Sequence, residues 1–160
     1  MKIDKNILSL PKAELHVHIE GTVTRDMALK KATEHNITLP DDILSDDGKS
    51  FIWNDFVECV TKVYDAVANT IRTKQDFSDI TYDYLKRCAD DGVLYVELIA
   101  SPEHCGRVGL SYPNMIEGIA EGIDKAKKEK GIEARINVAL VRHLSDDDLL
   151  KNTNIIASYD

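Results

Sequence analysis

The segment Glu14-Leu15-His16-Val17-His18-Ile19-Glu20-Gly21 holds the residues best suited to chemistry. As a β-strand it would place Glu14, His16, His18 and Glu20 on one face and the apolar residues on the other. Ionisable groups on a buried strand are costly to desolvate without a partner, and a divalent cation, most often Zn²⁺, is such a partner. Two imidazoles two residues apart lie about 7 Å from each other along a strand and can lean toward one ion. The pattern therefore predicts a metal site at His16 and His18, where Gly21 lets the backbone turn.

A competing interpretation is that the two histidines lie on the surface of an edge strand. Their place at the end of the first strand favours a site, because sites in β/α folds gather at the carboxyl ends of the strands. The other histidines carry weaker signals. We expect His35 at a helix end on the surface and His104 after the second strand, at the mouth of the expected site. His143 ends the third strand beside Arg142, where structural hydrogen bonding is the more typical role.

Strands are predicted at residues 13–19, 93–100 and 134–141, and their apolar runs are typical of parallel strands covered on both faces. Helical patterns separate them. One begins at a cap on Asn54 and carries an apolar stripe, and a second covers residues 77–88 and ends at Gly92. Two more follow, one from Pro113 to Gly131 and one after the cap Ser145. The stripe of the first comprises Phe56, Val60, Val63, Val67 and Ile71.

The chain has 160 residues, and a closed eight-stranded α/β barrel typically needs about 250. The predicted fold class is therefore α/β, a partial (β/α)8 TIM-type barrel with about three of the eight parallel strands. Residues 1–160 form one unit in this prediction. Residues 23–92 form a helical insertion after the first strand, and such an excursion often makes a lid or wall over a site.

Composition excludes several classes of partner. The formal net charge is −8 and no basic run occurs, which argues against nucleic-acid binding. No apolar stretch approaches the roughly 20 residues of a membrane span, and the N-terminus lacks the apolar block of a signal peptide. The 3 cysteines form no CxxC pair, as expected of reduced thiols in a cytoplasmic protein.

Three segments in order resemble the adenosine and adenine deaminase family, whose members are zinc-dependent hydrolases on a (β/α)8 barrel. The string Pro11-Lys12-Ala13-Glu14-Leu15-His16-Val17-His18-Ile19-Glu20-Gly21-Thr22 is similar to the family's opening motif. Tyr95-Val96-Glu97-Leu98 with Ser101-Pro102 resembles its second strand, and Ile136 through Arg142-His143 resembles its third. The resemblance covers essentially all of this chain but only the N-terminal part of the family's barrel.

The resemblance implies that His16 and His18 are ligands of one Zn²⁺ per complete site, and that His18 and Glu20 contact a purine nucleoside or nucleobase. The family reaction is the hydrolytic deamination of adenosine to inosine, or of adenine to hypoxanthine, with release of ammonia. Many adenosine-specific members have Asp where this chain has Glu20, and this difference counts against adenosine as the substrate. The Ser101-Pro102 pair favours adenosine over adenine.

The resemblance also places the family's third histidine ligand, proton donor, water-orienting histidine and metal-binding aspartate beyond residue 160. We therefore predict no catalytic residue within this segment and no deaminase activity from the chain alone, since zinc-activated water needs a partner acid. Two alternatives remain: a non-catalytic truncated remnant or partial-barrel binding module, and a different metallohydrolase on a related barrel. Uncovered strand edges predict self-association.

Overall fold

The computed structural model describes residues 5–142 and 144–159. Its helices and strands, in chain order, are α1 (Lys5–Ser9), β1 (Lys12–His18), the 3₁₀ turn η1 (Ile19–Thr22), α2 (Arg25–Glu34), the 3₁₀ turn η2 (Asp41–Ile43), α3 (Phe56–Glu58), the π-helix η3 (Cys59–Tyr64), α4 (Asp65–Ala68), α5 (Lys74–Asp90), β2 (Val93–Ala100), α6 (Pro102–Val108), α7 (Tyr112–Lys130), β3 (Glu133–Val138) and α8 (Asp146–Ala157).

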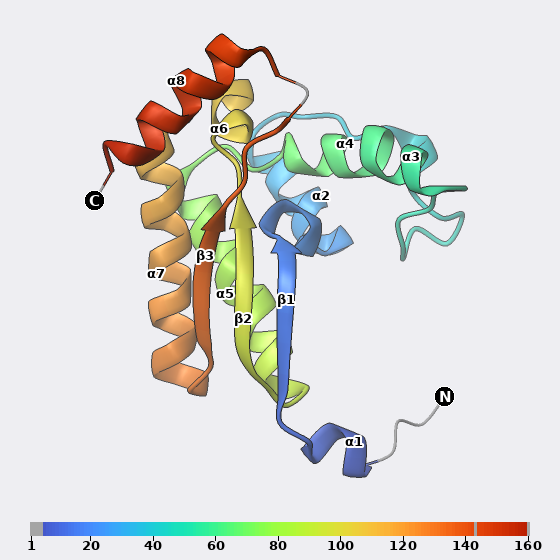
Figure 1. The fold of residues 1–160 in the computed structure, drawn as a ribbon. Helices are drawn as coiled ribbons and strands as arrows, with labels where there is room; N and C mark the ends of the chain where they lie inside the picture. The colour runs from blue at the N-terminus through green and yellow to red at the C-terminus, as the bar shows by residue number, and fades with distance from the viewer. Residues whose placement is uncertain (1–4, 143, 160) are drawn as a thin grey trace.

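The strands form one parallel sheet in the order β1-β2-β3 (Figure 1). The predicted fold class, α/β with three parallel strands, is confirmed, and β2 has the predicted bounds. The first strand ends one residue early because Ile19 already belongs to η1. The third ends at Val138, although the N–H of Ala139 still donates to the carbonyl oxygen of Ala100 at 2.9 Å.

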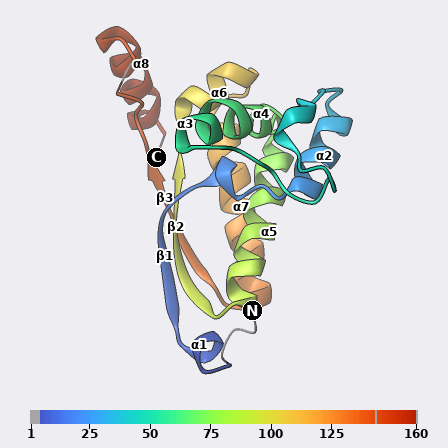
Figure 2. The same cartoon turned by 90° about the vertical axis from the view of Figure 1, so that its right-hand side faces the viewer.

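Helices α5 and α7 cover one face of the sheet, and Figure 2 shows the opposite face without a helical layer along β1 and β2. Val96, Leu98 and Ala100 of β2 are fully buried. The side chains that alternate with them include Tyr95 and Glu97, which are partly exposed. The described chain therefore covers one face of the sheet only and leaves the other face open, although apolar strands of this type are usually covered on both faces.

Two glycines of α7 let it pack closely against α5. A Cβ atom on Gly118 would lie 2.3 Å from the carbonyl oxygen of Lys74, and one on Gly122 would lie 2.6 Å from the Cβ of Thr81. Real Cβ atoms do not approach that closely, so the two backbones could not keep their present distance with larger residues.

Gly118→Ala is therefore expected to destabilise the chain by about 1–3 kcal/mol, although alanine is the better helix former. Gly106 in α6 is the matched control, because nothing lies within 4 Å of its Cβ position. Gly106→Ala is expected to stabilise the chain by up to about 1 kcal/mol. Urea unfolding of both variants measures the difference. Equal effects would contradict the close packing of α5 and α7.

Between β1 and β2 the chain makes an arm from α3, η3 and α4, where one continuous helix was predicted (Figure 1). Its cap is Asp55 rather than Asn54, since the Asp55 side chain accepts the N–H of Glu58. Val63 and Val67 are buried as predicted, but Phe56 is 80% exposed. The π-helix explains why Phe56 was wrongly predicted to share the buried stripe with Val63 and Val67. Its wider turn shifts the apolar stripe away from a period of 3.6 residues.

Helix α2 is tied to α5 by a buried ion pair. The Nζ atom of Lys31 lies 2.8 Å from Asp76 and 2.7 Å from Asp79, and the Lys31 and Asp76 side chains are both 3% exposed. His35, expected on the surface, is only 20% exposed, and its Nε2 lies 2.7 Å from the Asp76 carboxylate. A network of this kind fixes the excursion that follows β1 to the helical layer.

Three helix caps follow their sequence signals. Ser145 accepts the N–H of Asp148 at the start of α8, Ser111 caps α7 ahead of Pro113, and Gly131 ends α7 in the left-handed conformation. Helix α6, which was not predicted, begins with Ser101 as its cap and Pro102 in its first turn. None of the helices in the described ranges is long and apolar enough to cross a membrane.

Candidate metal and substrate site

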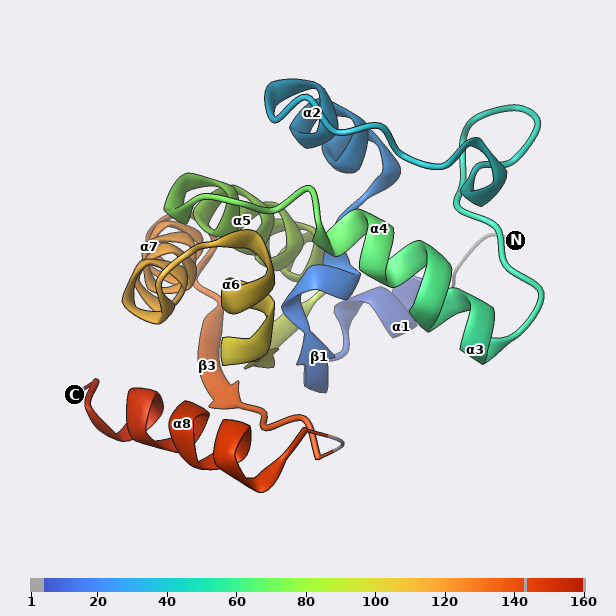
Figure 3. The same ribbon diagram turned by 90° about the horizontal axis from the view of Figure 1, so that it is seen from above.

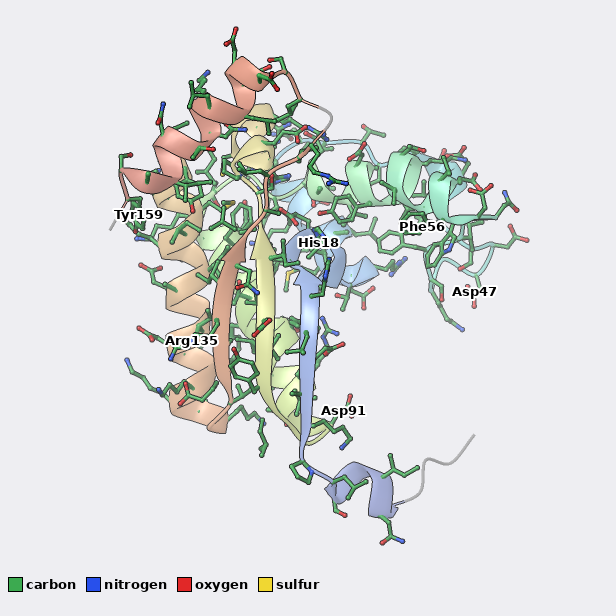
Figure 4. All side chains as sticks on the ribbon, viewed as in Figure 1. His18, Asp47, Phe56, Asp91, Arg135 and Tyr159 are labelled. Carbon is green, nitrogen blue, oxygen red and sulfur yellow. The ribbon has the colours of Figure 1, made fainter. Side chains whose placement is uncertain are left out.

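His16 and His18 lie on the same side of β1 at its carboxyl end, as their spacing predicts. Their ring centroids are 5.6 Å apart and the ring planes are inclined by 48°. Figure 4 shows His18 at the tip of the strand, on the side from which the arm projects. Two imidazoles this close can contribute nitrogen ligands to one cation.

A β-bulge interrupts β1 at His16. From Glu14 to Val17 the first strand advances 3 residues while β2 advances 2, from Val96 to Leu98. His16 takes up the extra residue with a φ of 63°. A non-glycine residue in this left-handed region is strained, and such strain is often found at functional sites.

The bulge separates Glu14 from the histidines, and the prediction that all four ionisable residues share one face is wrong for Glu14. Its carboxylate turns toward α5, where it accepts a hydrogen bond of 2.6 Å from the hydroxyl of Tyr84. The Cys88 thiol also lies 3.5 Å from it. Burial, with the nearby Glu14 carboxylate, raises the pKa of that thiol to about 11, so Cys88 stays protonated at neutral pH. The extra residue in β1 is the reason, since it inverts the alternation after Glu14.

Glu20 follows the histidines in η1 and is 3% exposed. Its Oε2 atom accepts a hydrogen bond of 2.8 Å from the hydroxyl of Tyr64, the last residue of the π-helix. Its Oε1 atom is buried and accepts no hydrogen bond from the described part of the chain. Burial and the negative charge of Glu20 raise the pKa of Tyr64 well above its ordinary value, so this hydroxyl remains a donor.

A cavity of about 810 Å³ joins these groups at the carboxyl ends of the strands. Figure 3 looks onto this end of the sheet, with the arm on one side and α6 on the other. Residues from β1, η1, the arm, α5 and α6 line it, together with two that follow β3. Among them are His16, His18, Glu20, Phe56, Cys59, Tyr64, Tyr84, Arg87, Ser101, His104, Arg107, Ala139 and Val141.

The remaining histidines add little to this site. His104 is buried; its Nε2 lies 3.4 Å from the carbonyl oxygen of Ile71 and its ring meets Phe77 edge-on. His143 lies outside the described residues. Tyr64 was missed by sequence reasoning, because its position depends on the π-helix, which has no clear signal in the sequence.

The residues present fit part of a metal site. Neutral imidazoles are common zinc ligands, and a catalytic zinc usually has three protein ligands and one open position. Across the described ranges, no third His, Cys, Asp or Glu atom groups with both imidazoles within 4.8 Å. The one such group, Glu34, His35 and Asp76, is occupied by the Lys31 ammonium, which already lies 2.8 Å from Asp76.

The sheet is parallel, and the imidazole pair and the buried Glu20 carboxylate meet at the carboxyl end of its first strand. The family model of adenosine deaminase matches residues 11–159, and the chain belongs to this family. The predicted family is thereby confirmed.

Relatives with curated names agree. The chain is 38% identical over 150 residues to an adenine deaminase of Sinorhizobium medicae, a match that covers 94% of this chain and 45% of the relative. It is 32% identical to an adenine deaminase of Acinetobacter baylyi, over 91% of this chain and 43% of the relative. The chain therefore spans less than half the length of these relatives.

Solved structures show the same fold. The adenine deaminase of Arthrobacter aurescens superposes with a TM-score of 0.76 at 25% identity, over 91% of this chain and 44% of that one. An amidohydrolase of Burkholderia ambifaria, solved with bound Zn, has a TM-score of 0.75 at 21% identity and covers 99% of this chain and 44% of that one. The sheet is thus the first part of a TIM-type barrel, as predicted.

Proposed function

We propose that this chain is the metal- and substrate-binding part of a hydrolase that deaminates a 6-aminopurine, with adenine as the expected substrate and hypoxanthine and ammonia as products. One observation carries the proposal. The imidazoles of His16 and His18 lie side by side on a cavity that Glu20 also lines, and one oxygen of this buried carboxylate has no hydrogen-bond partner among the described residues.

Each group has a physical role in this proposal. His16 and His18 would hold a divalent cation, with one Zn²⁺ per complete site as the expected ion. Bound there, the metal would lower the pKa of a water molecule and make it a nucleophile at neutral pH. Glu20 accepts a hydrogen bond from the purine, and His18 contacts the same ligand. The arm, with Phe56 and Tyr64 on the cavity, would cover one side of the purine.

Adenine is proposed over adenosine for two reasons. The relatives named above are adenine deaminases. The Ser101-Pro102 pair, which favoured adenosine, has a structural explanation: Ser101 caps α6 by accepting the N–H of Glu103, and Pro102 occupies the first turn. The pair is thus required by the local fold whichever purine is bound.

The test is a completed barrel, in which residues 1–160 are joined to the remaining segment of the Sinorhizobium medicae adenine deaminase. We expect this completed barrel to bind zinc and to release ammonia from adenine. The 160-residue chain alone is expected to release none, because His16 and His18 supply only part of the metal shell and no acid is identified among the described residues. Metal analysis and an ammonia assay on both proteins provide the readouts.

His18→Ala in the completed barrel should lower turnover by about 10³-fold or more, since a catalytic metal is worth several kcal/mol of barrier and 1.36 kcal/mol is tenfold in rate. Tyr82→Phe serves as the control, because the Tyr82 hydroxyl donates to Glu129 and Tyr82 does not line the cavity. A folded, zinc-loaded completed barrel that binds adenine and releases no ammonia would instead indicate a non-catalytic purine-binding module.

A further inference from the structure

The π-helix is the device that brings Tyr64 to Glu20. An α-helix turns 100° per residue, so the extra residue of a π turn rotates every later side chain about the helix axis by roughly that angle. After this turn Val63 and Val67 face the core while the Tyr64 ring lies against η1, 3.5 Å from the Cβ position of Gly21. π turns of this kind occur frequently at functional sites.

The two oxygens of Glu20 have different surroundings. Oε2 accepts the Tyr64 hydroxyl at 2.8 Å, whereas Oε1 is buried and has no partner among the described residues. A buried carboxylate oxygen without a hydrogen bond is costly, and native structures contain few such atoms. Glu20 is among the residues that line the cavity, so a bound ligand is a candidate donor to Oε1.

We propose that Tyr64 is a positioning residue that occupies one oxygen of Glu20, leaving the other as a single acceptor for the ring N–H of a free purine base. This inference rests on the proposed function and deepens it. A carboxylate with two free oxygens can accept two donors, such as the neighbouring hydroxyls of a ribose. With Oε2 occupied, the subsite matches one N–H, which a free base carries and which a nucleoside lacks at its glycosylated nitrogen.

The test compares adenine with 9-methyladenine, in which a methyl group replaces that N–H. Each is titrated by calorimetry into the 160-residue chain and into its Tyr64→Phe variant. The unchanged chain is expected to bind adenine about tenfold or more tightly than 9-methyladenine, as one hydrogen bond to a charged acceptor predicts. In Tyr64→Phe the Glu20 carboxylate is no longer held in this orientation, so most of that preference should disappear through weaker adenine binding, while the affinity for 9-methyladenine stays the same.

If Tyr64 had a merely structural role, Tyr64→Phe would lower the affinities for adenine and 9-methyladenine equally, and that result would overturn the proposal. It is also overturned if the preference survives Tyr64→Phe, or if the unchanged chain binds neither purine or shows no preference. Tyr82→Phe is the matched control, since the Tyr82 hydroxyl donates to Glu129 on the exposed side of the α5–α7 layer. It should leave both affinities unchanged.

Glu20→Gln tests the same subsite without altering the arm, in case Tyr64→Phe does not fold, and it should likewise abolish the preference. The deamination assay on the completed barrel separates the two proposals. Ammonia release from adenine together with an unchanged preference in Tyr64→Phe leaves the function standing and refutes the positioning role. If the preference is lost in Tyr64→Phe but the completed barrel releases no ammonia, the positioning role stands and the proposed function is refuted.

Discussion

Replacing His16 with glycine is expected to stabilise the chain and, in the completed barrel, to abolish metal binding. His16 has a φ of 63°, in the left-handed region where an L side chain costs about 1–2 kcal/mol. Glycine adopts this conformation without that cost but loses more backbone entropy on folding. The net gain should be about 1 kcal/mol in the free energy of unfolding, measured by urea denaturation of the 160-residue chain.

The same substitution removes an imidazole, so the completed barrel should lose its zinc. Its turnover rate should then fall by about 10³-fold or more. Asn36 provides the matched control for the backbone effect, because it also has a positive φ, of 54°. Asparagine tolerates that region, and Asn36→Gly should change stability by less than about 0.5 kcal/mol. A destabilised His16→Gly variant that kept its zinc would refute both the strain and the ligand assignment.

The Asp76→Asn substitution is expected to destabilise the chain by about 3 kcal/mol, the usual cost of breaking a buried ion pair from one side. The Asp76 carboxylate contacts the Lys31 ammonium and the His35 ring. It also accepts hydrogen bonds from the backbone N–H groups of Arg72 and Thr73. It also completes the capping box of α5. An amide cannot satisfy all of these donors, and Lys31 would lose the carboxylate that is buried with it.

The matched control is Asp79→Asn, which removes a second carboxylate from the same Lys31 ammonium. The Asp79 side chain is 33% exposed against 3% for Asp76, so solvent screens its interaction with Lys31. We expect Asp79→Asn to cost less than about 1 kcal/mol, as partly exposed ion pairs do. If urea unfolding gave equal losses for the two variants, burial would not be the factor that makes Asp76 important.

The pH dependence of stability should report on Asp76 as well. Burial by itself raises the pKa of this carboxyl, but hydrogen bonds from Lys31 and from the backbone N–H groups outweigh it and lower the pKa from 3.8 to about 2. A group whose pKa is depressed in the folded chain contributes stability above its unfolded pKa and loses it as the pH falls through the folded value. Stability should therefore drop between pH 4 and pH 2, and the drop should be smaller in Asp76→Asn.

Much of the architecture could be predicted from local sequence signals. The almost continuous apolar run at 93–100 marks β2 with its observed bounds, and Ser145 and Gly131 mark helix ends, because caps and apolar periodicity depend on neighbouring residues only. The pairing of His16 with His18 on one side of a strand was accessible in the same way, as was the family. Roles that depend on a bound metal or purine remain predictions.

Tertiary structure decided what local signals cannot. The bulge at His16 arises from the register of β1 against β2, and it sends Glu14 to Tyr84 on α5. The π turn places Tyr64 on Glu20, residues 44 positions apart in the chain. The bulge adds one residue to a strand and the π turn adds one residue to a helix. The spacing of apolar residues in the sequence does not show at which position either residue is added. Whether an added residue is tolerated depends on the free energy of packing against distant elements, which only the folded chain determines.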